Sequence, residues 1–278
     1  MTHEPTTGGR RTVVLCADDY GIAPGVCRGI RELLAAGRLS ATSCMVDFPE
    51  FRAEGPALAE FAERADIGLH VTLTIERGLA RVMADAYLRR FSAQTIAAEV
   101  DRQLDVFMRI MGRAPDHIDG HQHVHVLPVV RDAVCDAAAR VGAYVRNLHV
   151  PLTRTLGRPS PFAAACLSVM SRRIAGQSRE RGIETNHGYT GTRRFGAATP
   201  YRELMRKMIA GARDGELWVC HPGWSDATLA SRDPVTTPRE DELRYLASAE
   251  FAAELAEAGI ALGRLPRRAG ARAIIAAR

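Results

Sequence analysis

The feature of this chain that most limits its fold is a repeated alternation of short apolar segments with longer helical patterns. The first apolar segment, Thr12–Ala17, is a continuous run of the kind found in strands buried on both faces of a sheet. A helical pattern over Pro24–Ala36 follows at once and ends at Gly37, a residue type favoured at helix C-termini. This alternation predicts an α/β fold with a largely parallel sheet.

The same alternation continues along the rest of the chain. Further strands are expected at Ala41–Val46, Asp66–Thr72, His117–Asp119, Ala143–Arg146, Ile183–Asn186 and Leu217–Cys220, with a final one near Ile260–Leu265. Further helices are expected at Ser92–Met111, Pro128–Val141, Pro161–Arg181, Pro200–Ala212 and Pro238–Ala258. Seven or eight strands over 278 residues fit a (β/α) barrel, complete or incomplete, better than a doubly wound sheet. The first turn also has no GxGxxG motif.

The composition indicates one domain inside a reducing compartment. Because no stretch has the composition of a linker, a single catalytic domain over residues 11–266 is expected, with a flexible tail at 1–10 and a basic tail at 267–278. The six cysteines are scattered and form no CxxC pair, which is typical of buried free thiols. The chain lacks a signal-peptide pattern and any apolar run near the ~20 residues that span a bilayer. We therefore expect a cytoplasmic protein without a membrane partner.

The chain carries a formal net charge of +5, which raises the question of a nucleic-acid partner. Its paired arginines are dispersed at 10–11, 172–173, 193–194 and 267–268, without the interleaved aromatic residues that stack on bases. Solvated surface is the preferred interpretation of this charge. Nucleic-acid binding through the arginine-rich end, Arg264–Arg278, remains the least favoured alternative because no recognition motif accompanies it.

An acidic pair, Asp18 and Asp19, follows the first strand directly. In parallel α/β folds, ligands bind beyond the carboxyl ends of the strands, so this is a place where chemistry is expected. Aspartate also commonly caps a following helix or turn, and that interpretation stays open for either residue. Only one cap is needed, however, and both carboxylates precede the helix that begins near Pro24.

The segment HIDGHQHVH, residues 117–125, holds four of the nine histidines. Because side chains alternate along an extended backbone, His121, His123 and His125 would share one side of it. A cluster of unpaired imidazoles is expensive to bury, so the alternatives are a solvated surface and a metal site. Together with His70, which ends an otherwise apolar strand, the cluster favours a metal site.

Two imidazoles and one carboxylate form a familiar ligand set for one catalytic divalent ion, with positions left for water and substrate. Zinc or a similar transition ion suits nitrogen ligands better than magnesium does. Such an ion lowers the pKa of bound water and polarises a carbonyl group, which is the chemistry of amide or ester hydrolysis.

A hydrolase of this kind also needs a base and an acid. The carboxylate of the Asp pair that does not bind the ion can serve as the base, and His221 can serve as the acid, although it could equally be a structural histidine. Arg146, at the end of its strand, could hold Asp18 ionised, contact substrate or lie on the surface. No GxSxG motif indicates a serine nucleophile.

Four motifs occur in the order seen in the YdjC-like carbohydrate deacetylases, a family that includes chitooligosaccharide and hopanoid-biosynthesis-associated deacetylases. They are Ala17–Gly21 (ADDYG), Gly68–Thr74 (GLHVTLT), His117–His125 and Cys220–Gly223 (CHPG), with further similarity at Thr42–Val46 and Arg239–Leu243. The chain resembles this family from about Val13 to Leu246.

The resemblance implies a distorted (β/α) barrel of about seven mostly parallel strands, with the layout of polysaccharide deacetylases and often a homodimer. It implies removal of acetyl groups from N-acetylated amino sugars such as chitooligosaccharides. It places one divalent ion, zinc or magnesium, on Asp19, His70 and His121. It also makes Asp18 the base and His221 a catalytic partner. The residues expected to bind substrate are Tyr20, His123, His125, Asn186 and His187.

Two departures from the family pattern concern the substrate. The segment 75–91 after the His70 strand is brief, so one wall of the cleft is expected to be absent or rebuilt. His187 stands where family members tend to have an acidic residue. The alternatives to a sugar deacetylase are an amidase or esterase for a non-sugar acyl group and a non-catalytic sugar- or metal-binding protein. The presence of both Asp18 and His221 counts against the latter.

Overall fold

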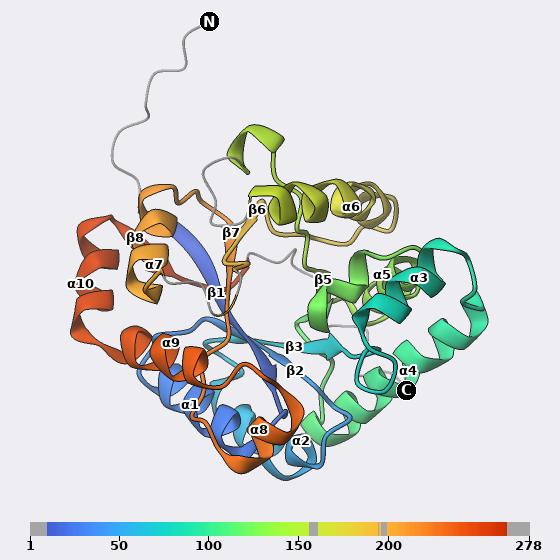
Figure 1. Ribbon diagram of the computed structural model, residues 1–278, viewed down its shortest axis with the longest axis horizontal. Coiled ribbons are helices and arrows are strands. Elements are labelled where there is room, and N and C mark those ends of the chain that lie inside the picture. Colours follow the sequence, from blue (N-terminus) through green and yellow to red (C-terminus); the bar gives the residue numbers. More distant parts are fainter. Residues whose placement is uncertain (1–9, 156–160, 194, 196–198, 266–278) are drawn as a thin grey trace, which may run out of the picture.

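Eight strands form one parallel sheet at the centre of the molecule, with helices around it (Figure 1). The computed structural model describes residues 10–155, 161–193, 195 and 199–265. The strands are β1 (Arg11–Tyr20), β2 (Ala41–Cys44), β3 (Asp66–Val71), β4 (His117–Gly120), β5 (Tyr144–Val145), β6 (Gly188–Thr190), β7 (Glu216–Cys220) and β8 (Ile260–Leu262). The expected tails at 1–10 and 267–278 lie outside the described residues, apart from Arg10.

The sheet runs in the order β5-β4-β3-β2-β1-β7-β6, and each of these pairings is parallel. The eighth strand, β8, pairs with the first residues of β1. A single parallel bridge between Val145 and Thr185 approaches the gap between β5 and β6. The result is a curled, incompletely closed (β/α) barrel, which confirms the predicted fold class.

Ten α-helices and three short 3-10 helices connect the strands in the described residues. The α-helices are α1 (Pro24–Ala35), α2 (Pro49–Glu54), α3 (Leu79–Tyr87), α4 (Ala93–Met111), α5 (Val130–Val141), α6 (Pro161–Glu180), α7 (Tyr201–Ala210), α8 (Ala227–Arg232), α9 (Thr237–Ala247) and α10 (Ala249–Glu257). The 3-10 helices are η1 (Gly55–Phe61), η2 (His121–Val126) and η3 (Leu152–Arg154). Within the described residues, no helix is both long and apolar enough to cross a membrane.

Two expected elements differ from the structure for local reasons. The helix expected over Pro238–Ala258 is divided into α9 and α10, because Ser248 is extended and its hydroxyl accepts a hydrogen bond from the Phe251 amide. The strand expected over Ile183–Asn186 begins instead at Gly188. The Asn186 side chain bonds the backbone of Asn147, in the segment after β5, and the Gly188 carbonyl oxygen, and the chain bends at His187 before β6 begins.

The sheet is buried on both faces, as a parallel sheet covered by helices requires. Every residue of β1 from Val13 to Tyr20 is buried, and so is every residue of β3. Inside the barrel the packing at Gly68 of β3 is especially close, because the His117 ring lies directly against it. That ring also stacks on Tyr144, at 5.0 Å between ring centroids, and its Nε2 lies 2.8 Å from Ser43 Oγ.

We predict that Gly68→Ala destabilises the protein, because the new Cβ would lie 2.2 Å from His117 Nε2 in a fully packed interior. Overpacking of this kind should lower the free energy of unfolding by about 1–3 kcal/mol in urea denaturation. The matched control is Gly176→Ala in α6, where the added Cβ meets no atom within 4 Å and should stabilise the helix by up to about 1 kcal/mol. Equal stability of Gly68→Ala and the wild type would contradict the close packing.

Candidate active site

Both aspartates of the acidic pair face one pocket, although they are neighbours in a strand. The strand extends beyond the expected end at Ala17 and includes both residues. Successive side chains of a regular strand point to opposite faces. Here the register of β1 against β2 is irregular between Ala17 and Tyr20, and Asp19 has a φ of 70°, in the left-handed region that aspartate tolerates better than most residues. This distortion lets Asp18 and Asp19 line the same pocket.

The pocket has a volume of about 350 Å³ and lies at the carboxyl ends of β1, β3 and β7, where a parallel barrel is expected to bind its ligand. Its lining includes six of the predicted site residues: Asp18, Asp19, His70, His121, His123 and His221. Segments that are more than 200 residues apart in the sequence therefore meet at one place.

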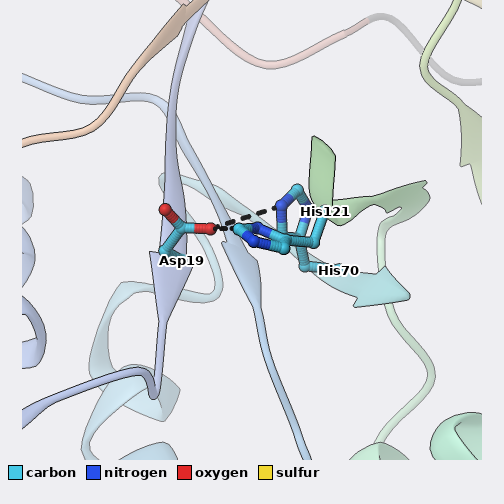
Figure 2. Close-up of side chains that lie close together, drawn as sticks. All are labelled: Asp19, His70 and His121. Carbon is cyan, nitrogen blue, oxygen red and sulfur yellow. Dashed lines mark hydrogen bonds and ion pairs between the residues drawn. The ribbon is translucent and has the colours of Figure 1, made fainter. Parts of the chain in front are cut away.

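Three side chains in this pocket are arranged as a donor set for a cation. Figure 2 shows His70 and His121 directed at one oxygen of Asp19, with His121 Nδ1 2.9 Å and His70 Nε2 3.5 Å from Asp19 Oδ1. One ligand atom from each residue lies within 4.8 Å of the other two. Atoms bound to one ion at about 2.0–2.1 Å are separated by roughly 3 Å, so small movements would complete the set.

The surroundings of His70 also fit a metal ligand. Its Nδ1 lies 2.6 Å from Asp119 Oδ1, which leaves Nε2 facing the pocket, as in the carboxylate–histidine pairs that orient metal ligands. Burial opposes a charge on this ring, but Asp119 and Asp18 outweigh it and raise the pKa of His70 to about 10. This corner of the pocket therefore stabilises a positive charge.

A buried arginine holds the second oxygen of Asp19. Arg239 of α9 donates from Nη2 to Asp19 Oδ2 at 2.6 Å and to Asp233 Oδ2 at the same distance. Burial would raise the pKa of Asp19, but Arg239 and then His121 outweigh it and hold this pKa well below its ordinary value. Asp19 is therefore ionised, with Oδ2 occupied by Arg239 and Oδ1 directed at the two histidines.

A second buried arginine holds Asp18. Arg146 Nη1 lies 2.7 Å from Asp18 Oδ2, and Nη2 lies 2.6 Å from Oδ1, while Nη2 also lies 2.5 Å from Asp119 Oδ2. These contacts lower the pKa of Asp18 despite its burial. Of the three alternatives for Arg146, the structure shows the pairing with Asp18. Because Arg146 is fully buried, it positions a pocket residue and is not on the surface.

The histidine cluster has a different backbone from the one expected. His121, His123 and His125 are not on an extended strand but in η2, where Gln122 and His123 have positive φ angles of 51° and 63°. The side chains therefore diverge. His121 and His123 line the pocket, whereas His125 is buried with Nε2 3.1 Å from the Arg146 carbonyl oxygen. Burial lowers the pKa of His123 to about 3 and that of His125 to about 4, so both rings are neutral at pH 7.

Among the five residues expected to bind substrate, the structure places only His123 in the pocket lining. The Tyr20 hydroxyl donates to the Glu54 carbonyl oxygen at 2.7 Å. Asn186 is buried and bonded to backbone. His187 is exposed beside Gly215. His125, Tyr20 and Asn186 therefore bond other parts of the fold. His187 lies outside the pocket lining.

His221 also lines the pocket and is held there by residues to which the sequence motifs assign no role. Its backbone amide donates to Glu242 Oε2 at 2.6 Å, and its ring lies edge-on to Phe195, at 5.2 Å between centroids. Burial lowers the pKa of His221 against the opposing effects of Asp19 and Asp18. Arg239 and Glu242 both lie in the Arg239–Leu243 motif, which resembles the family but whose sequence indicates no role for either residue. Asp119 lies in the His117–His125 motif without an assigned role, and Asp233 has no distinguishing local pattern.

We predict that Arg239→Met is strongly destabilising, because it leaves the buried Asp19 carboxylate without its arginine partner. Removing one member of a buried ion pair costs about 3–5 kcal/mol, measurable by urea denaturation. The matched control is Arg244→Met on the same helix, whose side chain is 57% exposed and pairs with Glu240. That change should cost no more than about 1 kcal/mol. Similar decreases in the free energy of unfolding of the two variants would show that the buried Arg239–Asp19 ion pair contributes no more to stability than the exposed Arg244–Glu240 pair.

The comparisons with known proteins agree with the motifs. Residues 12–257 match the YdjC-like protein family. A carbohydrate deacetylase of Homo sapiens is 29% identical over 91% of this chain and 90% of its own length. A chitooligosaccharide deacetylase of Citrobacter koseri is 27% identical over 91% of this chain and 97% of its own.

Among solved structures, a protein of Enterococcus faecalis V583 to which cellobiose-phosphate cleavage is ascribed has the same fold. Its TM-score is 0.71 at 20% sequence identity, and the match covers 92% of this chain and 98% of that one. The motifs, the barrel and the matched span of residues 12–257 lead to one conclusion. This chain belongs to the YdjC-like protein family.

Proposed function

We propose that this protein is a metal-dependent hydrolase that removes the acetyl group from an N-acetylated amino sugar or a chitooligosaccharide-like substrate. The observation that carries the proposal is the donor set of Asp19, His70 and His121 beside a second ionised carboxylate, Asp18. The relatives named carbohydrate and chitooligosaccharide deacetylases support a sugar as the substrate. The residues of the pocket support the type of reaction, which is hydrolysis, and the relatives support the class of substrate, which is a carbohydrate.

The donor atoms for one divalent ion would be Asp19 Oδ1, His70 Nε2 and His121 Nδ1. Two imidazole nitrogens with one carboxylate oxygen suit zinc better than magnesium, which prefers oxygen ligands. When bound, the ion would polarise the acetyl carbonyl and lower the pKa of a water molecule. Three protein ligands leave positions for water and substrate.

Asp18 is proposed as the base. Its carboxylate lines the pocket 4.0 Å from His70 Nε2, so it lies beside the donor set without being its best-placed ligand. Arg146 keeps this carboxylate ionised, and a carboxylate can accept further hydrogen bonds while it is bonded to an arginine. Asp18 can therefore take a proton from the attacking water.

His221 is proposed as the acid that protonates the departing amine. Its lowered pKa makes the ring neutral at rest, so it must gain a proton during the reaction before it can donate one. The source would be the proton that Asp18 accepts from the attacking water, which must pass from the Asp18 carboxyl group to the His221 ring and then to the amine, so that Asp18 is ionised again. The edge-on contact with Phe195 and the Glu242 contact with its backbone fix the position of the ring.

The test is acetate release from N-acetylglucosamine oligomers by metal-loaded protein, before and after removal of the ion with a chelator. We expect activity to disappear with the ion and to return when zinc is added. His70→Ala and His121→Ala should lose bound metal, measured by elemental analysis, together with activity. The control is His187→Ala, an exposed histidine outside the pocket lining, which should retain both. Robust activity in His70→Ala or His121→Ala would overturn the assignment of the ligands.

A further inference from the structure

The segment that follows β3 carries an exposed apolar surface. Six large hydrophobic residues are exposed in the described part of the chain, and three of them lie in this segment: Ile75, Tyr87 and Leu88, at 50%, 51% and 60% exposure. The segment contains α3, which contacts η2, the 3-10 helix that begins at His121. None of residues 75–91 lines the active-site pocket. The pocket therefore does not explain these exposed side chains.

The outward side of α3 is mostly apolar, although it faces solvent. A helix at a protein surface normally buries apolar side chains and presents polar ones. The only acidic residue of α3, Asp85, is instead buried together with Val82 and Ala86. The residues of α3 that are exposed or half-buried are Leu79, Ala80, Arg81, Met83, Ala84 and Tyr87. Among these only Arg81 is charged, and the exposed Leu88 follows directly.

Four exposed arginines border this apolar side, and little negative charge balances them. They are Arg77, Arg81, Arg89 and Arg90. Glu76 is the only exposed acidic residue in the segment, because Asp85 is buried where it contacts Arg81 at 2.9 Å. Within the described residues, the guanidinium groups of Arg77 and Arg89 form no hydrogen bond or ion pair. We call the three exposed apolar residues and these four arginines the α3 surface.

Apolar side chains bordered by arginines match the surface of a bilayer that contains anionic lipids. At such a surface, isoleucine and leucine enter the boundary of the acyl chains, and tyrosine stays at the level of the headgroups. Arginine lays its aliphatic stem along apolar surface while its guanidinium group bonds phosphate. The expectation of no membrane partner rests on the lack of a spanning pattern in the sequence, and binding at a surface needs none.

A second copy of the chain or another protein fits the α3 surface less well. Two copies that face each other across a twofold axis would bring the same arginines together, and like charges across an interface are unfavourable. The outward side of this nine-residue helix is roughly 14 Å long and about 10 Å wide. That is far below the ~800 Å² that each partner of a stable protein complex contributes. Binding to a bilayer instead scales with the apolar area and the charge that are present.

We propose that the α3 surface docks this protein on a bilayer that contains anionic lipids. Because α3 contacts η2, which carries His121, docking would hold the active-site pocket close to the lipid headgroups. The docking residues lie outside the pocket lining, so the proposal does not depend on the proposed function.

The test is co-sedimentation with vesicles of phosphatidylcholine that contain roughly one third phosphatidylglycerol, compared with vesicles of phosphatidylcholine alone. The wild type should bind the mixed vesicles more tightly and lose most of this binding in about 1 M salt, where the Debye length falls to about 3 Å. Arg77→Gln with Arg89→Gln should weaken binding roughly 25-fold, or about fivefold for each arginine. The matched control, Arg109→Gln with Arg179→Gln, removes two exposed arginines from the last turns of α4 and α6, which lead back to the amino ends of β4 and β6. It should bind like the wild type.

Leu88→Ser tests the apolar part of the α3 surface. Because this side chain is already largely exposed, the fold should be unaffected, whereas affinity for the mixed vesicles should fall roughly tenfold. Val169→Ser on α6, at 51% exposure, is the matched control and should bind normally.

The proposal is overturned if the wild type does not bind the mixed vesicles, or if either substitution in the α3 surface has no more effect than its control. It is also overturned if the wild type forms a dimer in analytical ultracentrifugation that Leu88→Ser dissociates, since a second copy would then cover the surface. Acetate release from soluble N-acetylglucosamine oligomers is measured separately. Vesicle binding of the expected kind without any acetate release would reject the proposed function and keep the docking surface.

Discussion

The active-site pocket depends on two neighbouring carboxylates, each neutralised by its own buried arginine. Two carboxylates in one buried site normally cannot both ionise, and the pKa of one of them rises strongly. Here Arg146 pairs with Asp18 and Arg239 pairs with Asp19, and the pKa of each carboxyl group is lowered. Buried ion pairs contribute little net stability compared with apolar packing. Their presence at the carboxyl end of β1 is therefore better explained by chemistry than by folding.

The two arginines also give the two carboxylates different geometries. Arg146 holds both oxygens of Asp18, whereas Arg239 holds only Oδ2 of Asp19 and leaves Oδ1 to the two histidines. Arg146 follows β5 and Arg239 lies on α9, both far from β1 in the sequence. The two carboxylates therefore have different partners only after the barrel has folded. The left-handed backbone at Asp19 completes the arrangement, because a regular strand would turn one carboxylate away.

Sequence reasoning succeeded where the information is local. The buried strands and most helices follow from apolar periodicity. The motifs at the carboxyl ends of the strands contain Asp18, Asp19, His70, His121 and His221, which the structure places in one pocket. It failed where the contact of a single side chain, local or distant, decides the outcome. Because of the contacts of the Asn186 side chain, β6 begins at Gly188 and not at Ile183. The N-cap at Ser248 divides the last expected helix into α9 and α10. The alternation of the histidines predicts extended backbone, whereas positive φ angles at Gln122 and His123 make their side chains diverge. Arg239 has no local feature that indicates a partner 220 residues away.

The most direct measurement is the metal content of Asp18→Asn and Asp19→Asn, determined by elemental analysis after identical zinc loading and paired with acetate release. Both substitutions remove one negative charge from the same pocket and preserve side-chain size. If Asp19 is the ligand and Asp18 the base, Asp18→Asn retains about one ion per chain and loses roughly 100- to 10,000-fold in kcat, while Asp19→Asn loses the ion itself. Retention of the ion by Asp19→Asn together with its loss from Asp18→Asn would contradict this division of roles.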